Sequence, residues 1–147
     1  MKKIVILIVL LMLSASAFAS FKDGEYIAKE DKYSFWGWKA YVKIIIKDGK
    51  VISVDHDYEN KKGGKQSQDE KYNKDMFKSK KTDPKTFTAK WSKELLDEQS
   101  ADKIDTIAGA TESHTKFVTL SKLLLEKAQT GETGEYVLKK SKLEKVK

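Results

Sequence analysis

The residues best suited to chemistry form the run DTIAGATES, residues 105–113. This run separates two Lys/Glu-rich helical patterns. Gly109 permits a positive φ and close approach of other groups, and Ala110 adds only a methyl group. Thr111 therefore presents a hydroxyl where a large planar or phosphorylated group can approach without a clash. Ser113 is expected to cap the helix that follows, whose first amides and dipole favour an anion beside Thr111.

The first seven residues of this run, DTIAGAT, resemble the Asp-x-x-(Ser/Thr)-Gly-Ala-Thr flavinylation motif of FMN-binding domains. Such domains occur in the C subunit of the sodium-pumping NADH:quinone reductase, in the G subunit of the Rnf complex and in small exported flavoproteins. Ala108 stands where many members carry Ser or Thr. The blocks WGWKAYVKIIIKDGKVISVDHDY, QSQDEKYNKDM and DPKTF are similar to the small stand-alone members.

The resemblance implies that a flavin transferase joins the phosphate of FMN to Thr111 by a phosphoester, with Gly109 and Ala110 in the cofactor site. It also implies that Asp105 is the motif carboxylate, which positions the loop or assists the transferase with a metal. Without the resemblance, Thr111 is interpreted as an N-capping residue, Asp105 as a surface acid and Ser113 as a cap whose hydroxyl could also serve the phosphate. A covalent bond suits an exported protein, because free FMN is scarce outside the cytoplasm and a dissociable cofactor is lost by mass action.

Four aromatic residues are candidates for contact with the isoalloxazine ring, although core or rim positions are their ordinary role. A flavin needs an apolar face and a few hydrogen-bond donors. We expect one or two of them to stack on the ring, and we place Trp38 and Tyr58 together at one end of a hairpin. The four are Trp36, Trp38, Tyr58 and Tyr72.

Metal and hydrolytic chemistry find little support in the sequence. Asp55, His56 and Asp57 cannot converge on a metal ion, because adjacent strand residues point to opposite faces. The two histidines, His56 and His114, have no Ser or Cys partner at a recognisable spacing, so no nucleophile–base–acid set is predicted.

Cysteine and arginine are both absent from the 147 residues. The lack of cysteine excludes disulfides, lipid attachment at the cleavage point, C-x-x-C-H haem attachment and thiolate-held iron–sulfur clusters. The lack of arginine argues against nucleic-acid binding, because bidentate recognition of guanine and phosphate favours Arg. The lysine excess is interpreted as a solvated face, with attraction to an anionic membrane surface as a minor alternative.

The first 19 residues read as a signal peptide. Lys2 and Lys3 precede an apolar run over residues 4–13, and the residues Ala17 to Ala19 form an A-x-A cleavage site. The apolar run is too short for a spanning helix, which needs about 20 residues. Cleavage leaves residues 20–147 as one FMN-binding domain and lowers the formal net charge from +7 to +5.

The hydrophobic pattern predicts an α+β domain, in which an antiparallel sheet is built on a central hairpin with helices packed on one side. Apolar residues alternate on both sides of Asp48-Gly49 over residues 36–58. We expect a three-residue loop, Lys47 to Gly49, since it opposes Ile44 to Ile52. Further predicted elements are a strand at 21–29, helices at 69–78, 83–99 and after 113, and a short strand at 136–138.

The function expected is electron carriage in the periplasm or cell envelope by FMN held on Thr111, from a membrane reductase or a quinone-linked donor. A carrier is favoured over a complete enzyme, because no second domain is present for a nicotinamide or organic substrate. The alternative is an exported binding or surface-antigen module of the same fold without flavin. An enzyme that reduces its own small substrate is a third option.

Overall fold

The structure, a computed structural model, describes residues 20–143. The predicted signal peptide and residues 144–147 lie outside the described residues. The strands are β1 (Gly24–Glu30), β2 (Lys39–Lys47), β3 (Lys50–Glu59) and β4 (Gly134–Leu138), and the helices are α1 (Glu70–Lys80), α2 (Pro84–Glu98), α3 (Thr111–Thr130) and α4 (Lys140–Leu143). Among these residues no helix combines the length and the apolar character needed to cross a membrane.

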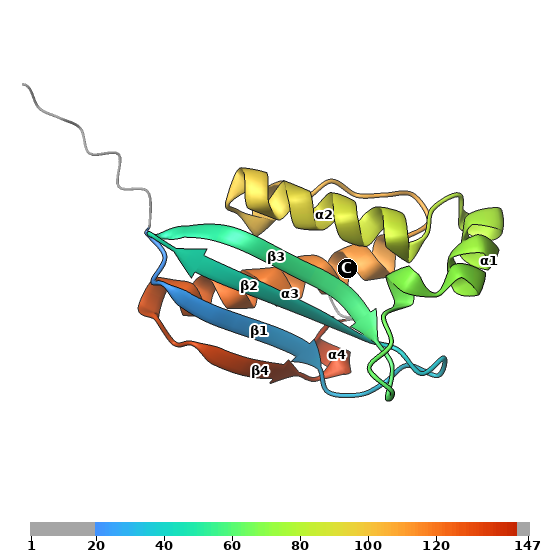
Figure 1. The fold of residues 1–147 in the computed structure, drawn as a ribbon, viewed down its shortest axis with the longest axis horizontal. Coiled ribbons are helices and arrows are strands. Elements are labelled where there is room, and N and C mark those ends of the chain that lie inside the picture. The colour runs from blue at the N-terminus through green and yellow to red at the C-terminus, as the bar shows by residue number, and fades with distance from the viewer. Residues whose placement is uncertain (1–19, 144–147) are drawn as a thin grey trace, which may run out of the picture.

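The four strands form one open sheet in the order β3-β2-β1-β4. β1 and β2 are antiparallel, as are β2 and β3, whereas β4 runs parallel to β1. The predicted α+β class of a single small domain is confirmed, with a mixed sheet. The β2–β3 hairpin forms one side of that sheet, because β1 and then β4 add to the other side of β2 (Figure 1).

The core lies between one face of the sheet and the helices α2 and α3 (Figure 1). Alternation along the strands directs every second residue into this layer, and a 3.6-residue period gives α3 one apolar face. The apolar spacing of Phe117, Leu120, Leu124 and Ala128 in the sequence predicts this face of α3, and all four are fully buried. The largest contributions come from Tyr26, Val42, Ile44, Phe87, Trp91, Leu95, Phe117, Leu120 and Leu124.

The hairpin turn differs from the sequence-based prediction. Lys47 pairs with Lys50, so the loop contains two residues, Asp48 and Gly49, and the predicted three-residue loop is wrong. Both loop residues have positive φ, 52° and 76°. This is the conformation of a type I′ turn, whose twist matches that of the flanking strands.

A β-bulge explains why the apolar pattern suggested a longer loop. Ile46 pairs with Val51 and Ile45 with Ser53, so Ile52 is an extra residue on β3. Ile52 is exposed. The extra residue shifts the alternation by one position, so that His56 and Tyr58 of β3 point to the buried face. With a two-residue turn and no bulge, these residues would point to the opposite face.

The two long helices begin in different ways. The Asp83 carboxylate caps α2 by accepting a hydrogen bond from Thr86 N–H at 2.8 Å, with Pro84 at the first helical position, as predicted. The prediction that Ser113 caps α3 is wrong. This helix starts at Thr111, and its N-cap, Ala110, has no side chain able to accept a hydrogen bond.

Candidate functional site

The 109–111 loop borders a partly enclosed space of about 280 Å³, which is called the cavity below. Its walls come from five parts of the chain: the β1–β2 connection, the end of β3, the segment of residues 66–76, the helix α2 and the start of α3 with the loop before it. The lining combines aromatic rings with polar and charged side chains. The lining residues include Trp36, Trp38, Tyr58, Gln66, Tyr72, Met76, Phe87, Gly109, Ala110, Thr111, Glu112, Ser113 and Lys116.

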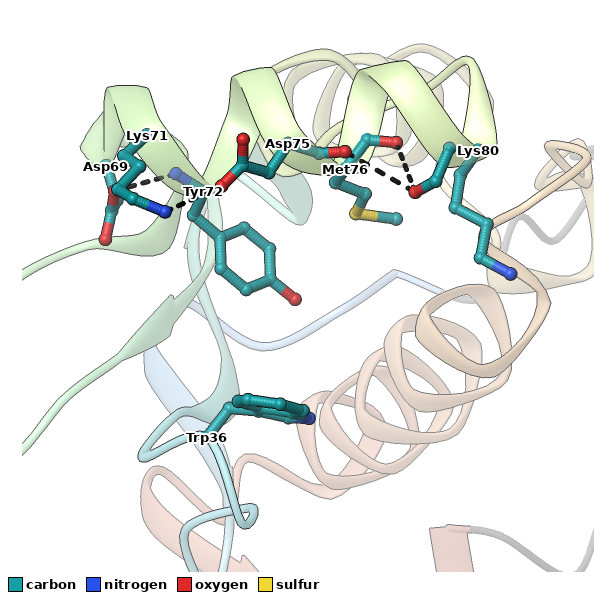
Figure 2. A pocket seen from close by; sticks show the side chains of 8 residues that line it. Trp36, Asp69, Lys71, Tyr72, Asp75, Met76 and Lys80 are labelled. Carbon is teal, nitrogen blue, oxygen red and sulfur yellow. Dashed lines mark hydrogen bonds and ion pairs between the residues drawn. The ribbon is translucent and has the colours of Figure 1, made fainter.

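A wider groove of about 690 Å³ shares three residues with the cavity, namely Trp36, Tyr72 and Met76. Figure 2 shows Trp36 on one side of this groove, with Tyr72 and Met76 pointing toward it from α1 on the other. The lysines Lys71 and Lys80 also line it. The cavity and the groove together offer a space with aromatic walls that opens to solvent.

α1 forms one wall of this space, and a buried amide fixes its position. The Asn73 side chain donates to the Gln66 carbonyl at 2.8 Å and accepts from the Lys85 N–H at 2.9 Å. Asp69 caps the helix by accepting from Tyr72 N–H at 2.9 Å. These bonds link α1 both to the segment before it and to the start of α2.

Six of the seven site residues predicted from the sequence line the cavity: Trp38, Tyr58, Gly109, Ala110, Thr111 and Ser113. Asp105 does not. Its side chain is 75% exposed and lies 3.4 Å from the Lys90 ammonium. Its backbone carbonyl accepts a hydrogen bond from Trp91 Nε1 at 2.9 Å, which ties this part of the loop to α2.

Gly109 allows the loop to approach α1, a role that the sequence did not indicate. Its φ is +89°, and a Cβ at this position would lie 2.7 Å from the Lys80 carbonyl oxygen. A side chain here would therefore combine backbone strain with a clash against the backbone at the C-terminal end of α1. The small-residue run serves packing as well as access to Thr111.

His114 holds the segment before the loop. Its Nε2 lies 2.8 Å from the Ile104 carbonyl, and its ring packs edge-on against Trp91. The ring is therefore turned toward residues 104–105 and does not line the cavity. His114 belongs to the support of the loop.

The Tyr58 hydroxyl is a buried polar group at the cavity wall. It makes no hydrogen bond of good geometry with the described residues, although Ser113 lies near it. Burial raises the pKa of Tyr58 well above its usual value, and the Ser113 hydroxyl opposes this shift. The phenol therefore stays protonated and can donate a hydrogen bond to a ligand oxygen or nitrogen.

A buried ion pair lies beneath Thr111. Lys116 Nζ is 3.0 Å from Glu30 and 3.2 Å from Glu112, and both Lys116 and Glu30 are at most 5% exposed. Burial alone would lower the pKa of Lys116, but the two carboxylates outweigh it and raise this pKa. The ammonium therefore remains charged at the cavity wall, 5.9 Å from the centre of the Tyr58 ring.

The residues Asp55, His56 and Asp57 do not converge, as the strand geometry requires. His56 is buried in the core, and its Nδ1 lies 2.8 Å from the Tyr41 carbonyl. The Asp57 carboxylate accepts bonds from the Ser67 hydroxyl and amide, so it positions the segment that carries Gln66. Within residues 20–143 no group of three potential ligands forms a metal site.

Six lining residues were not identified as site residues from the sequence: Ser34, Gln66, Met76, Phe87, Glu112 and Lys116. The signal for Lys116 was present: it lies four residues before Leu120, on the buried side of α3. Glu30 likewise follows Tyr26 and Ala28 at a spacing of two, which directs its carboxylate inward. An acid and a base that both occupy buried positions indicate a buried ion pair.

Fold and cavity together define an α+β domain with an aromatic-lined space beside a helix N-terminus. The 15 kDa lipoprotein of Treponema pallidum (strain Nichols) is 31% identical over 121 residues, which cover 82% of this chain and 86% of the relative. The chain therefore belongs to the family of this lipoprotein. The relative's name supports export and attachment to the cell envelope, and it names no ligand.

One solved structure gives the same architecture. The CPE2226 protein of Clostridium perfringens superposes with a TM-score of 0.76 at 30% identity, over 81% of this chain and 98% of that one. A solution NMR structure from Clostridium thermocellum is 26% identical over 73% of this chain and 92% of that one, with a TM-score of 0.49. No protein-family model matches the sequence.

Proposed function

We propose that this protein is an electron carrier of the periplasm or cell envelope, with FMN attached to Thr111 by a phosphoester. The observation that supports the proposal most strongly is the meeting of Thr111 with Trp38, Tyr58 and Tyr72 in one cavity, although these residues are far apart in the sequence. A flavin supplies one- and two-electron chemistry when bound. The chain's own part is to hold the phosphate, enclose the ring and set its surroundings.

The residues at the start of α3 suit a phosphate. No side chain caps this 20-residue helix, so its first-turn N–H groups have no side-chain acceptor. Thr111 and Ser113 line the cavity there, and the Lys116 ammonium lies on the same wall. An anion beside these groups is favoured by the helix dipole and by hydrogen bonds from the free amides.

The remaining walls suit a flat aromatic ring. Trp38, Tyr72 and Met76 offer apolar surface, and the unpaired Tyr58 hydroxyl offers a donor. The cavity and the groove share Trp36, Tyr72 and Met76, so these three residues would border a ring that needs more room than the cavity offers. Apolar and aromatic surface beside a few directed polar groups is a usual composition of a cofactor site.

Attachment requires a flavin transferase. The new bond joins Thr111 Oγ1 to the flavin phosphorus, the hydroxyl proton is lost, and the bond from phosphorus to the leaving group of the donor nucleotide breaks. Thr111 is exposed and therefore open to such an enzyme. Asp105 is also exposed, on the solvent side of the loop, where it would meet the transferase. The electron donor would be a membrane reductase or a quinone-linked protein.

The first prediction concerns the site of attachment. In cells that also produce a flavin transferase, the exported wild type should give a flavin-fluorescent band on a denaturing gel, because a covalent bond survives unfolding. Thr111→Ala and Thr111→Val should lose the band completely. Thr106→Ala and Thr115→Ala are the matched controls and should keep it, since they remove neighbouring hydroxyls only.

Intact mass measured on the same preparations checks the result independently. A flavin band in Thr111→Ala would show that the attachment site is wrong. If wild type carries no flavin while the transferase modifies a known substrate in the same cells, the flavin proposal fails. The exported binding module without flavin then becomes the better description.

A further inference from the structure

The connection between β1 and β2 presents two large aromatic side chains directly to solvent. Phe35 is 92% exposed and Trp36 is 75% exposed, and their rings pack edge to face at 5.2 Å. Single exposed apolar residues are ordinary, but two adjacent large rings at the tip of a loop mark a contact surface.

A closed turn holds these rings outward. Ser34 N–H donates to the Trp38 carbonyl at 2.7 Å, and Gly37 N–H donates to the Ser34 carbonyl at 2.9 Å. Phe35 and Trp36 are the central residues of this turn. Gly37 has φ +82° with open space around it, so the tip is free of packing against the rest of the described chain on that side.

On the side of the turn after β3, the surroundings of the tip carry an excess of lysines. The connection and the turn after β3 leave the sheet at the same end of the molecule (Figure 1). Lys39 and Lys61, one from each segment, both lie over the Tyr33 ring, at 4.8 and 5.8 Å. Residues 31–39 and 59–62 contain four lysines, Lys32, Lys39, Lys61 and Lys62, against the two acids Asp31 and Glu59.

The two acids offset only part of this charge. Glu59 is 3.7 Å from Lys39 and also 3.7 Å from Lys29 of the neighbouring strand. Asp31 accepts a hydrogen bond from the Lys140 backbone N–H at 2.9 Å, away from the aromatic tip. Lys32, Lys61 and Lys62 are exposed beside the tip.

We infer that the 33–38 turn binds the surface of an anionic lipid bilayer, with Phe35 and Trp36 inserted at the interface and the lysines beside the headgroups. Aromatic side chains concentrate at the level of the headgroups, and lysines near an anionic leaflet are attracted to it. Trp36 also lines the cavity and the groove, so binding places their openings at the bilayer surface, where lipid-soluble electron donors dissolve. The inference does not depend on the presence of flavin.

Trp36 provides its own optical signal. Of the three tryptophans, Trp38 is 9% exposed and Trp91 is fully buried, so Trp36 is the solvent-facing one. The purified exported protein is mixed with vesicles of phosphatidylglycerol and phosphatidylcholine, or of phosphatidylcholine alone. Only the anionic vesicles should shift the tryptophan emission to shorter wavelength and carry the protein into the pellet. Added salt should weaken this binding.

The variant Phe35→Ser/Trp36→Ser tests the tip. Both side chains are exposed, so the thermal midpoint should be unchanged while the vesicle partition coefficient falls by roughly tenfold or more. The control Ile52→Ser removes an exposed apolar residue beside the β2–β3 turn, at the other end of the sheet from the tip, and should bind as wild type does. Trp36→Phe should still pellet but should lose the emission shift.

Two results would overturn the inference. One is the absence of binding to anionic vesicles at low salt, which would point to a protein partner for the tip. The other is equal binding by wild type and the Phe35→Ser/Trp36→Ser variant, which would leave only a diffuse attraction of lysines. Flavin content is measured on the same samples. Failure of vesicle binding can then be distinguished from failure of flavin attachment.

Discussion

The interior between the sheet and the helices has two aromatic regions that differ in how they are closed. In the first, which we call the packed region, Trp91 stacks on Phe87 at 4.9 Å and on Phe117 at 6.0 Å, and His56 lies 4.7 Å from Phe117. In the second, around the cavity, Trp38 and Tyr72 meet edge to face at 6.4 Å beside open space. Both regions are built from aromatic rings, and Phe87 of the packed region also borders the cavity.

The difference lies in the elements that supply the rings. Trp91 and Phe117 come from the middle of long helices, and His56 comes from a long strand, so the backbone of each is fixed on both sides. Around the cavity, Trp36 and Trp38 come from a connection and Tyr72 from a short helix. The long helices and the strand of the packed region pack along their length and leave no space between their side chains. The connection and the short helix meet only at one end of the sheet, and this leaves room for a ligand.

The largest stability effect is expected in the packed region. Trp91→Ala should lower the free energy of unfolding by about 4 kcal/mol, because it removes a fully buried ring and its hydrogen bond to the Asp105 carbonyl. Urea denaturation measures the loss. A cost below about 1 kcal/mol would show that this region is no better packed than the cavity walls.

The second prediction uses the buried histidine of the packed region. Burial lowers the pKa of His56 to about 4, and the hydrogen bond to the Tyr41 carbonyl opposes only part of this shift. With its proton on Nδ1, the buried Nε2 has no partner, so a second proton would add a charge and an unpaired donor. The unfolded chain therefore binds this proton more readily than the folded chain does.

This difference makes the folded state less stable as the pH falls. The stability linked to neutral His56 is complete above the unfolded pKa of about 6.5 and is lost as the pH falls toward 4, where the loss reaches about 3 kcal/mol. Carboxylates also titrate in this window, so His56→Gln is the reference. The free energy of unfolding of this variant should fall less between pH 7 and pH 4 than that of wild type. An equal dependence on pH in the two proteins would contradict the low pKa of His56.

The third prediction addresses how the cavity is held open. Gly109→Ala should cost about 2 kcal/mol, since the new Cβ combines a positive φ with a contact of 2.7 Å to the Lys80 carbonyl oxygen. Gly63→Ala is the matched control, because Gly63 has φ +79° with nothing near a Cβ. Equal melting temperatures for the two variants would show that the contact with α1 contributes nothing.

The smallest stability effect is expected at the cavity wall. Tyr72→Leu should change the free energy of unfolding by less than about 1 kcal/mol, because this ring is only half buried and borders open space. If flavin is attached, its absorption spectrum should shift in this variant. A loss as large as that of Trp91→Ala would erase the distinction between the two regions.

The sequence predicted the packed region better than the cavity. Period two along the strands and the apolar spacing in α2 and α3 place most of the buried residues correctly, since these patterns are local. The bulge at Ile52 escaped this reasoning, because an extra residue changes the facing of a strand without changing its composition. The start of α3 was placed too late, because Ala110 carries none of the usual capping side chains.

The cavity depends on contacts between distant segments. The loop with Thr111 and the pair Trp38 and Tyr58 were identified, from the resemblance and from the hairpin respectively. Gln66 and Met76 reach the cavity only because Asn73 and Asp69 fix the orientation of α1, and no periodicity encodes that orientation. Asp105 was assigned to the site by motif alone, and the structure places it on the solvent side of the loop.

The parallel pairing of β4 with β1 constrains the order in which the protein assembles. Tyr26 pairs with Gly134 and Glu30 with Leu138, so the edge of β1 is completed by residues made more than a hundred positions later. A chain that emerges from its N-terminus therefore leaves this edge uncovered until almost all of it is available. Such long-range pairing slows folding. The sheet of this exported chain is therefore completed only when nearly the whole sequence is available to fold.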